Sequence, residues 1–280
     1  MKVSQREIEK MAAQIRRDVV LMIGGDGHVG HLGGSCSCAD IVAALYTAKM
    51  KGDPANPKWP GRDKLLMSKG HACIAQYAAL AELGYFSKEH LVTLKSFGSM
   101  LQGHPDINKT PGIEANTGSL GQGLSIANGM ALAMRLDGLA DTHKVYCIMG
   151  DGEMAEGQIW EAAMAAKNFK IDNIVGILDL NGLQATGPVK DRFDTNPMPE
   201  KWAAFGWHVI EIDGHDIPQI LAALDEADTV KGQPTMIIAH TVKGKGISFA
   251  ENVVGFHNGA MTHEQYETAL RELDERLAQF

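Results

Sequence analysis

The sequence predicts an α/β fold, a doubly wound parallel sheet with helices on both faces, and three observations support this prediction. Short apolar and β-branched runs at 145–149, 173–178, 208–212 and 235–239 have the composition of buried parallel strands. Helical segments alternate with these runs, as expected when helices cover a parallel sheet. The 280 residues, of which 45% are hydrophobic, suffice for a substantial core.

The helices are indicated by apolar residues at three- and four-residue spacing. The first spans 4–23 and ends at Gly24-Gly25, a common helix stop. We expect one domain over 1–280, with a helical N-terminal layer over about 1–60 and a final exposed helix over 262–280. The helices expected between these are 37–50, 71–83, 120–136, 158–167 and 217–224.

Composition and charge exclude several classes of function. The formal charge of -8 argues against a nucleic-acid partner, because binding a phosphate backbone normally needs a basic face. No apolar run approaches the length of a membrane span, and the N-terminus lacks the apolar core of a signal peptide, so we expect a cytoplasmic protein without a membrane partner. The cysteines lack C-x-x-C spacing and are expected to be buried thiols: Cys36, Cys38, Cys73 and Cys147.

A candidate metal and diphosphate site begins at Gly150-Asp151-Gly152. It follows one predicted strand, and Asn181 ends the next, so both lie at the carboxyl edge of the sheet, where ligands bind. Asp151, Asn181 and the backbone carbonyl of Leu183 would offer oxygen ligands to a hard divalent cation. Gly152 would let a diphosphate approach the main chain. Gly-Asp-Gly alone is more often a simple turn, but strand, spacing and asparagine together favour the ligand site.

Three loop histidines follow a glycine, at Gly30-His31, Gly70-His71 and Gly103-His104. A lone histidine is more often structural than catalytic. Three Gly-His pairs beside a candidate phosphate site favour catalysis, since imidazole exchanges protons near neutral pH.

Two further glycine-containing segments carry weaker signals. Residues 117–123 open a predicted helix, and their glycines permit close backbone contact with a flat ligand; a ligand-free helix start is the alternative. Residues 242–246 read Val-Lys-Gly-Lys-Gly, a run that solvated lysines also explain, and His257 follows Lys243 by fourteen residues.

These motifs carry a family resemblance. Residues 150–183 resemble the thiamine diphosphate motif of transketolases, and Gly-Asp-Gly-Glu-Met-Ala-Glu-Gly-Gln-Ile-Trp-Glu-Ala-Ala is close to the transketolase version. Gly-His-Leu-Gly-Gly, Ser-Lys-Gly-His-Ala and Gly-His-Pro-Asp match the histidine motifs of that family. The resemblance covers about residues 10–260. It implies the thiamine diphosphate-binding fold, thiamine diphosphate with Mg²⁺ (or Ca²⁺ or Mn²⁺), and transfer of a two-carbon ketol unit from a ketose to an aldose.

The resemblance also implies roles for individual residues. His31 and His104 would contact the sugar, and His71, with Lys69 nearby, would lie close to cofactor and donor. Gly34 and Leu32 depart from the serine and proline usual in the family, and Gly34 removes a possible cofactor contact. The implied catalytic residues are His31, His71, His104, Glu156 and His257. The implied cofactor-binding residues are His71, Gly118, Leu120, Gly152, Glu153, Glu156, Asn181 and Lys243, and the metal ligands are Asp151, Asn181 and Leu183.

A separate partner is implied as well. In transketolases, the glutamate that hydrogen-bonds the cofactor's pyrimidine ring lies on a second α/β domain, and this chain stops where that domain would begin. The resemblance therefore implies the N-terminal subunit of a split transketolase, which forms an α2β2 heterotetramer with a C-terminal subunit and acts on sugar phosphates or modified sugars. Glu156 is expected to be buried at the start of its helix and to face this partner, supported by Glu161.

Two alternatives stay open. The chain could belong to another thiamine diphosphate enzyme, similar to a deoxyxylulose-phosphate synthase or a 2-oxoacid dehydrogenase component, which would release carbon dioxide from pyruvate or a related acid. It could also be a cofactor-binding partner without activity of its own. Fold-level analogy alone would not separate these alternatives.

Overall fold

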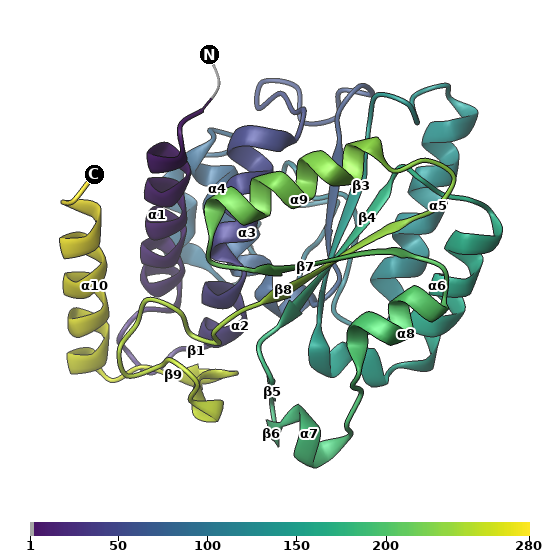
Figure 1. Ribbon diagram of the computed structural model, residues 1–280. Coiled ribbons are helices and arrows are strands. Elements are labelled where there is room, and N and C mark those ends of the chain that lie inside the picture. Colours follow the sequence, from purple (N-terminus) through teal and green to yellow (C-terminus); the bar gives the residue numbers. More distant parts are fainter. Residues whose placement is uncertain (1–2) are drawn as a thin grey trace.

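The computed structural model describes residues 3–280, so residues 1 and 2 of the expected domain lie outside the described part (Figure 1). Its centre is a five-stranded, fully parallel sheet, which confirms the predicted α/β class. Four strands coincide with the four predicted runs, and the fifth, β2, was not predicted. In spatial order the strands are β2 (Lys64–Met67), β3 (Val145–Gly150), β4 (Ile174–Leu180), β8 (Thr235–His240) and β7 (His208–Asp213).

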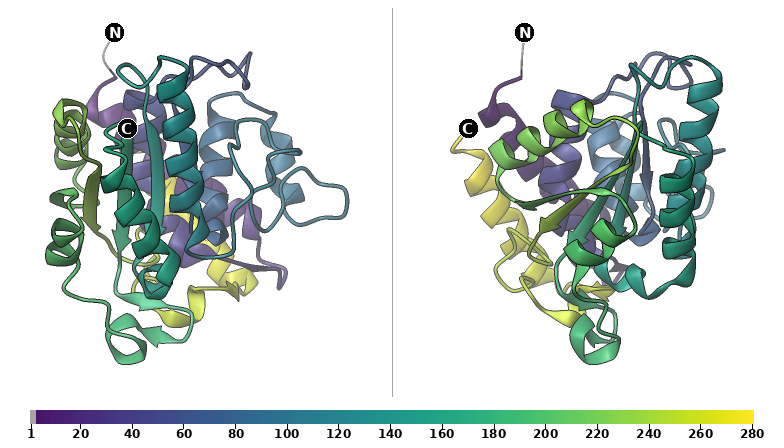
Figure 2. Two further views of the ribbon diagram at one scale, coloured as in Figure 1. Left: turned by 90° about the vertical axis from the view of Figure 1, so that its right-hand side faces the viewer. Right: turned by 45° about the vertical axis from the view of Figure 1, so that its right-hand side comes forward.

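Helices cover both faces of the sheet, as Figures 1 and 2 show. Side chains alternate along each strand, so that Ile148 of β3 joins one hydrophobic core and Met149 joins the other. The first core receives α1 (Gln5–Ile23), α2 (Leu32–Ser37), α3 (Ala39–Ala44), α4 (Cys73–Glu82) and α9 (Ile217–Thr229). The second core receives α5 (Gln122–Leu136), α6 (Gly157–Asn168) and α8 (Met198–Ala204).

The order of the strands reverses between β4 and β8. The connection from β3 through α6 to β4 and the connection from β7 through α9 to β8 cross the sheet in opposite directions. Because such crossovers are right-handed, the two helices lie on opposite faces. A crevice forms at the carboxyl ends of β4 and β8, where ligands of open α/β sheets bind.

The N-terminal helices differ in part from the prediction. The first helix begins with a capping box between Ser4 and Glu7 and ends before Gly24, as expected. The helix expected over 37–50 is instead divided among α2, α3 and a π-helical turn, Leu45–Lys49, and it begins at Leu32. None of the helices within residues 3–280 is long and apolar enough to cross a membrane.

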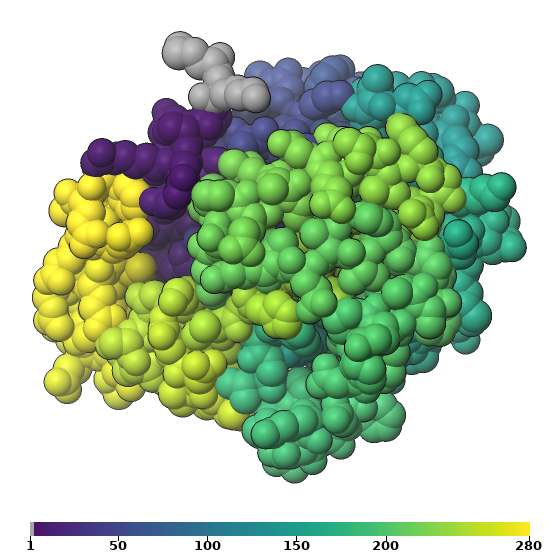
Figure 3. Space-filling model, viewed as in Figure 1, coloured from purple at the N-terminus to yellow at the C-terminus, as the bar shows by residue number. Residues whose placement is uncertain are grey.

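The C-terminal helix α10 (His263–Leu277) packs beside α1, and the space-filling view shows the purple segment that contains α1 next to the yellow segment that contains α10 (Figure 3). An ion pair between Arg17 and Asp274 at 2.5 Å joins the two helices. Short elements complete the fold: antiparallel β1 (Val29–Gly30) with β9 (Gly259–Ala260), antiparallel β5 (Leu183–Gln184) with β6 (Gly187–Pro188), helix α7 (Val189–Arg192), and 3₁₀ turns at Gly70–Ala72, Lys88–Thr93, Asp151–Ala155 and Val254–Phe256.

Candidate active site

A cavity of about 310 Å³ lies at the carboxyl ends of β3 and β4, beside the loop that follows β8. This volume falls within the range of small-molecule sites. Most of the residues singled out from the sequence line it, although they come from segments far apart in the chain. The lining residues are Gly34, Lys69, His71, Leu120, Gly150, Asp151, Gly152, Glu153, Asn181, Leu183, Gln184, Ala185, Thr186, Lys243 and His257.

The three expected metal ligands lie together on one wall of this cavity. Asp151 accepts hydrogen bonds from the backbone N–H groups of Gly152, at 2.8 Å, and Gly182, at 2.5 Å. The side-chain oxygen of Asn181 accepts from the backbone N–H of Leu183 at 3.1 Å. The Leu183 carbonyl accepts from the ammonium group of Lys243 at 3.1 Å. A cationic group thus already contacts one of the expected ligand oxygens.

The chemistry of this oxygen set fits a hard divalent cation. It holds one carboxylate, one amide oxygen and one backbone carbonyl, and it leaves coordination positions for phosphate oxygens and water. Burial raises the pKa of Asp151 to about 6, and the negative charge of Asp179 adds to this shift. The carboxylate of Asp151 therefore has too little positive charge around it to balance its own charge. Residues 3–280 contain no cluster of three or more His, Cys, Asp and Glu side chains suited to a metal, but the expected set includes only one such side chain.

Glu153 connects three loops beneath the cavity. Its carboxylate is buried and accepts hydrogen bonds from the Ser68 hydroxyl at 2.5 Å, the Gly121 N–H at 2.9 Å and the Gly150 N–H at 3.1 Å. Glu153 therefore fixes the start of α5, where Leu120 reaches the cavity, relative to the Gly150-Asp151 turn. Gly152 lies against Gln184, since an added Cβ would be 2.9 Å from that side-chain oxygen.

Four histidines gather next to this cavity. The ring centroids of His31 and His71 are 5.1 Å apart, those of His71 and His257 are 5.0 Å apart, and those of His31 and His257 are 5.7 Å apart. His104 lies 6.1 Å from His31 and is the exposed member. The pairing of β1 with β9 explains part of this arrangement, because it brings the residue after Gly30 close to the loop before Gly259.

The environment keeps these imidazoles neutral. Burial lowers the pKa of His31 to about 4, and the charge of Lys95 adds to this effect. Burial lowers the pKa of His257 to about 4, with a further contribution from the charge of Lys243. Burial lowers the pKa of His71 to about 2, and the charge of Lys69 lowers it further. Burial also lowers the pKa of His104. A neutral imidazole has one donor and one acceptor nitrogen. The Nδ1 atoms of His31 and His257 are buried without a hydrogen-bond partner among residues 3–280.

A family model described as the thiamine diphosphate binding domain of transketolase matches residues 8–274. The chain belongs to the transketolase family. Among its relatives, the 6-deoxy-6-sulfo-D-fructose transketolase subunit SqwG of Clostridium sp. (strain MSTE9) is 47% identical over 274 residues, with 98% of each chain covered. An apulose-4-phosphate transketolase subunit of Phocaeicola vulgatus is 43% identical, and the match covers 98% of this chain and 96% of the relative.

Solved transketolases share the fold of this chain. A variant of the Pichia stipitis enzyme superposes with a TM-score of 0.88 at 28% identity, over 97% of this chain and 44% of its own. The Leishmania mexicana transketolase gives a TM-score of 0.85 at 31% identity, over 100% of this chain and 45% of its own. The chain therefore spans somewhat less than half of these solved transketolases.

Two glycines of the transketolase motifs, Gly118 and Gly34, lie against the histidines. Gly118 has a φ of +141°, and an added Cβ would be 2.7 Å from the ring of His104. Gly34, where the family often has serine, faces His71, since an added Cβ would be 3.4 Å from its Nε2. Both glycines thus set how closely the backbone approaches the histidine cluster, and serine at residue 34 would contact His71 directly.

One prediction about burial is wrong. Glu156 precedes α6 as its N-cap, but it is exposed, and so is Glu161 one turn later. Glu161 is exposed because the apolar face of α6, with Ile159, Ala162 and Ala163, points into the core and leaves it on the opposite side. Glu156 precedes the first helical residue in an extended conformation, so its side chain does not follow the buried face of the helix. The stem of Glu156 packs on Gly121, whose added Cβ would lie 2.7 Å from the glutamate Cβ.

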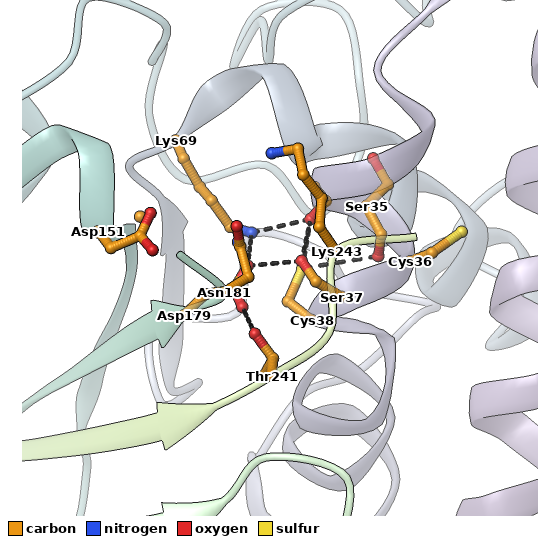
Figure 4. A network of polar contacts seen from close by, with 12 residues as sticks. Ser35, Cys36, Ser37, Cys38, Lys69, Asp151, Asp179, Asn181, Thr241 and Lys243 are labelled. Carbon is orange, nitrogen blue, oxygen red and sulfur yellow. Dashed lines mark hydrogen bonds and ion pairs between the residues drawn. The ribbon is translucent and has the colours of Figure 1, made fainter. Parts of the chain in front are cut away.

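The sequence reasoning missed the polar network under the cavity, shown in Figure 4. Asp179, fully buried near the end of β4, forms an ion pair with Lys69 and accepts hydrogen bonds from the hydroxyls of Ser37, at 2.6 Å, and Thr241. The Asn181 amide also donates to Asp179, at 3.3 Å. The network holds the ends of β4 and β8 and the loop after β2 in one arrangement. An aspartate inside an apolar strand was the available signal.

Proposed function

We propose that this chain is the diphosphate-binding subunit of a split transketolase that moves a two-carbon ketol unit from a ketose to an aldose. The observation that carries the proposal is a cluster of four histidines, of which His71 and His257 line the same cavity as the three expected metal ligands. Sugars present several hydroxyl groups, which need matching donors and acceptors. A decarboxylating thiamine diphosphate enzyme has no need for so many groups of this kind.

We propose that Asp151, Asn181 and the Leu183 carbonyl hold Mg²⁺, for which Ca²⁺ or Mn²⁺ can substitute. When bound, thiamine diphosphate supplies a nucleophilic carbanion, and the protein supplies position and charge. Lys243 is 2% exposed, and burial, followed by the charge of Lys69, lowers its pKa to about 8. Pairing with a diphosphate would compensate the buried ammonium group, and the Leu183 carbonyl would then be free for the metal.

Each histidine has a proposed role that follows from its place. His71 and His257 line the cavity, next to the proposed cofactor and donor, and His31, whose ring centroid is 5.1 Å from that of His71, contacts the sugar. His104, the exposed member, handles the hydroxyl proton of the incoming sugar. A neutral imidazole has one donor and one acceptor nitrogen, so these histidines can hold sugar hydroxyls by hydrogen bonds.

The proposed partner is a separate C-terminal transketolase subunit. The two relatives described above are named subunits, and this chain covers almost their whole length. Glu156 and Glu161 are both exposed, and Glu156 lies against Gly121 at the start of α5, a position suitable for contact with a second chain. We propose an α2β2 assembly in which Glu156 supports the partner's pyrimidine-binding glutamate. Four free, buried cysteines accord with a reducing, cytoplasmic location.

The proposed donor is a ketose with an anionic end group. The relatives are named for 6-deoxy-6-sulfo-D-fructose and for apulose 4-phosphate. A sulfonate and a phosphate share the need for positive charge at the far end of the sugar. Comparing a sulfonated ketose with a phosphorylated one separates the two possibilities.

The test combines this chain with a candidate C-terminal transketolase subunit, sought first in the adjacent open reading frame. We expect negligible ketol transfer by the chain alone, and turnover with thiamine diphosphate and Mg²⁺ once both subunits are mixed. Mass photometry should show a heterotetramer. Turnover by this chain without a partner would refute the split-enzyme proposal, and release of carbon dioxide from pyruvate would favour the decarboxylating alternative.

A further inference from the structure

The loop after β8 brings two side chains to the site. The hydroxyl of Thr241 donates to Asp179, and the ammonium group of Lys243 donates to the Leu183 carbonyl at 3.1 Å. Val242 lies between them, and its backbone N–H donates to Nε2 of His215 at 2.8 Å. An imidazole outside the cavity therefore holds the backbone from which Lys243 enters it.

The local structure fixes His215 against this loop. His215 follows β7, the neighbour of β8, and its own N–H donates to the Asp213 carboxylate at 2.8 Å. Gly214 donates its N–H to the carbonyl of His240 at 2.8 Å, and an added Cβ would be 2.5 Å from Thr241. Glycine thus permits the close contact that places the imidazole over Val242.

A buried ion pair orients the imidazole from its other side. Nδ1 of His215 donates to Asp40 at 2.7 Å, and Asp40 pairs with Arg16, whose Nε also donates to the Cys36 carbonyl at 3.2 Å. The exposed side-chain fractions are 9% for Arg16, 10% for Asp40 and 14% for His215. Because Nε2 accepts from Val242, Nδ1 must carry the proton, and Asp40 stabilises this tautomer.

We infer that Arg16, Asp40 and His215 act as positioning residues that aim Lys243 at the diphosphate position through the Val242 backbone. This inference rests on the proposed cofactor role of Lys243. The arrangement parallels metal sites in which a carboxylate orients a histidine that in turn orients the functional group. A buried ion pair contributes little net stability compared with apolar packing, so its main consequence here is the fixed geometry of the loop.

The first test measures the loop itself, without cofactor. His215→Ala removes the acceptor for Val242, and hydrogen exchange of the peptide covering 239–246 should accelerate by about tenfold or more. His208→Ala is the matched control, because His208 also pairs with a carboxylate, Glu226 at 2.6 Å, but at the other end of β7. Unchanged exchange in His215→Ala, or an equal effect in the control, would overturn the inference.

The second test asks whether the effect passes through Lys243. With the partner subunit present, thiamine diphosphate and Mg²⁺ are titrated calorimetrically into His215→Ala, Lys243→Met and the double variant. We expect each single variant to bind about 10- to 100-fold more weakly, as for lost outer-shell partners, and the double variant to match Lys243→Met within about twofold. His215→Gln, which retains one acceptor and one donor, should recover part of the affinity.

The outcomes separate this inference from the proposed function. If His215→Ala and Lys243→Met weaken binding additively, the two residues act independently and the inference fails, while the cofactor role of Lys243 stands. If Lys243→Met binds like the unmodified protein, the proposed role of Lys243 fails, and the inference fails with it.

Discussion

The carboxyl groups of Asp18 on α1 and Glu82 on α4 form a buried pair whose effect on stability depends on pH. Asp18 is 2% exposed, the Gln14 amide donates to its Oδ1 at 2.9 Å, and its Oδ2 has no hydrogen-bond partner within residues 3–280. Burial, followed by the adjacent Glu82 carboxyl, raises the pKa of Asp18 from 3.8 to about 7. Asp18 therefore carries a proton in the folded chain at mildly acidic pH, whereas the nearby Glu82 forms an ion pair with Lys88 at 2.5 Å.

The sign of the effect follows from linkage. The folded-state pKa of Asp18 exceeds the unfolded value, so the stabilising contribution is complete below pH of about 4 and is lost as the pH rises through about 7. Each tenfold change in acidity corresponds to about 1.4 kcal/mol, which gives a ceiling on the order of 4 kcal/mol for this difference. The effective dielectric around a buried charge exceeds that of a dry protein interior, so we expect roughly half of that ceiling.

Asp18→Asn tests this reasoning. The new amide can still accept from Gln14 and can donate to Glu82 at every pH. We expect the free energy of unfolding at pH 8 to rise by about 2 kcal/mol relative to the unmodified chain, and the difference to vanish near pH 4. Urea unfolding, followed by two optical probes at one protein concentration, measures it, with exposed Asp141→Asn as the control. A destabilised variant at pH 8, or a difference independent of pH, would refute the interpretation that burial raises the pKa of Asp18.

Three further predictions concern the site. Asp151→Asn keeps an acceptor for Gly182 but loses the anionic ligand, so Mg²⁺-dependent binding of thiamine diphosphate should weaken by about 100-fold in calorimetry while the far-UV spectrum is unchanged. His104→Ala should lower kcat/KM for the ketose by about 10²- to 10⁴-fold with little change in cofactor affinity; full turnover would make His104 structural. The residue at 118 has a φ of +141°, and in Gly118→Ala the new Cβ would clash with the His104 ring, so kcat/KM should fall and a crystal structure should show the ring displaced. Gly138→Ala is the control, because an added Cβ there meets nothing within 4 Å and kcat/KM should not change.

The strands were predictable where composition alone marks them. The run at 145–149 is apolar with flanking polar residues, and the observed strand β3 begins at the same residue, Val145. Strand β2 is only four residues long, starts with a lysine and contains no β-branched residue, so no pattern separated it from a loop. Helix α8 begins at Met198 with a proline in its first turn, and Pro199 reads equally as a loop residue.

The site was predictable only where its residues follow strands that the sequence marks. Asp151 and Asn181 follow strands, so their meeting at the sheet edge could be inferred from topology. The contact between Asp179 and Lys69 joins residues 110 positions apart, and no local pattern specifies it. The apolar stripe from Ile159 to Ala166 does reveal that Glu161 faces away from the core. It does not predict the exposure of Glu156, which stands at helical spacing from Ile159 but precedes the helix in an extended conformation.

The charges beneath the cavity differ in how completely they are compensated. Lys69 and Asp179 form a closed pair: burial opposes both charges, yet their attraction holds the pKa of Asp179 below and that of Lys69 above the usual values. Asp151 and Lys243 show the opposite pattern, since burial dominates and shifts both pKa values towards the neutral forms. A metal cation beside Asp151 and a diphosphate beside Lys243 would each supply the missing countercharge. The chain therefore carries one neutralised pair that fixes the strand ends, and two uncompensated charges whose signs match the cofactor of its family.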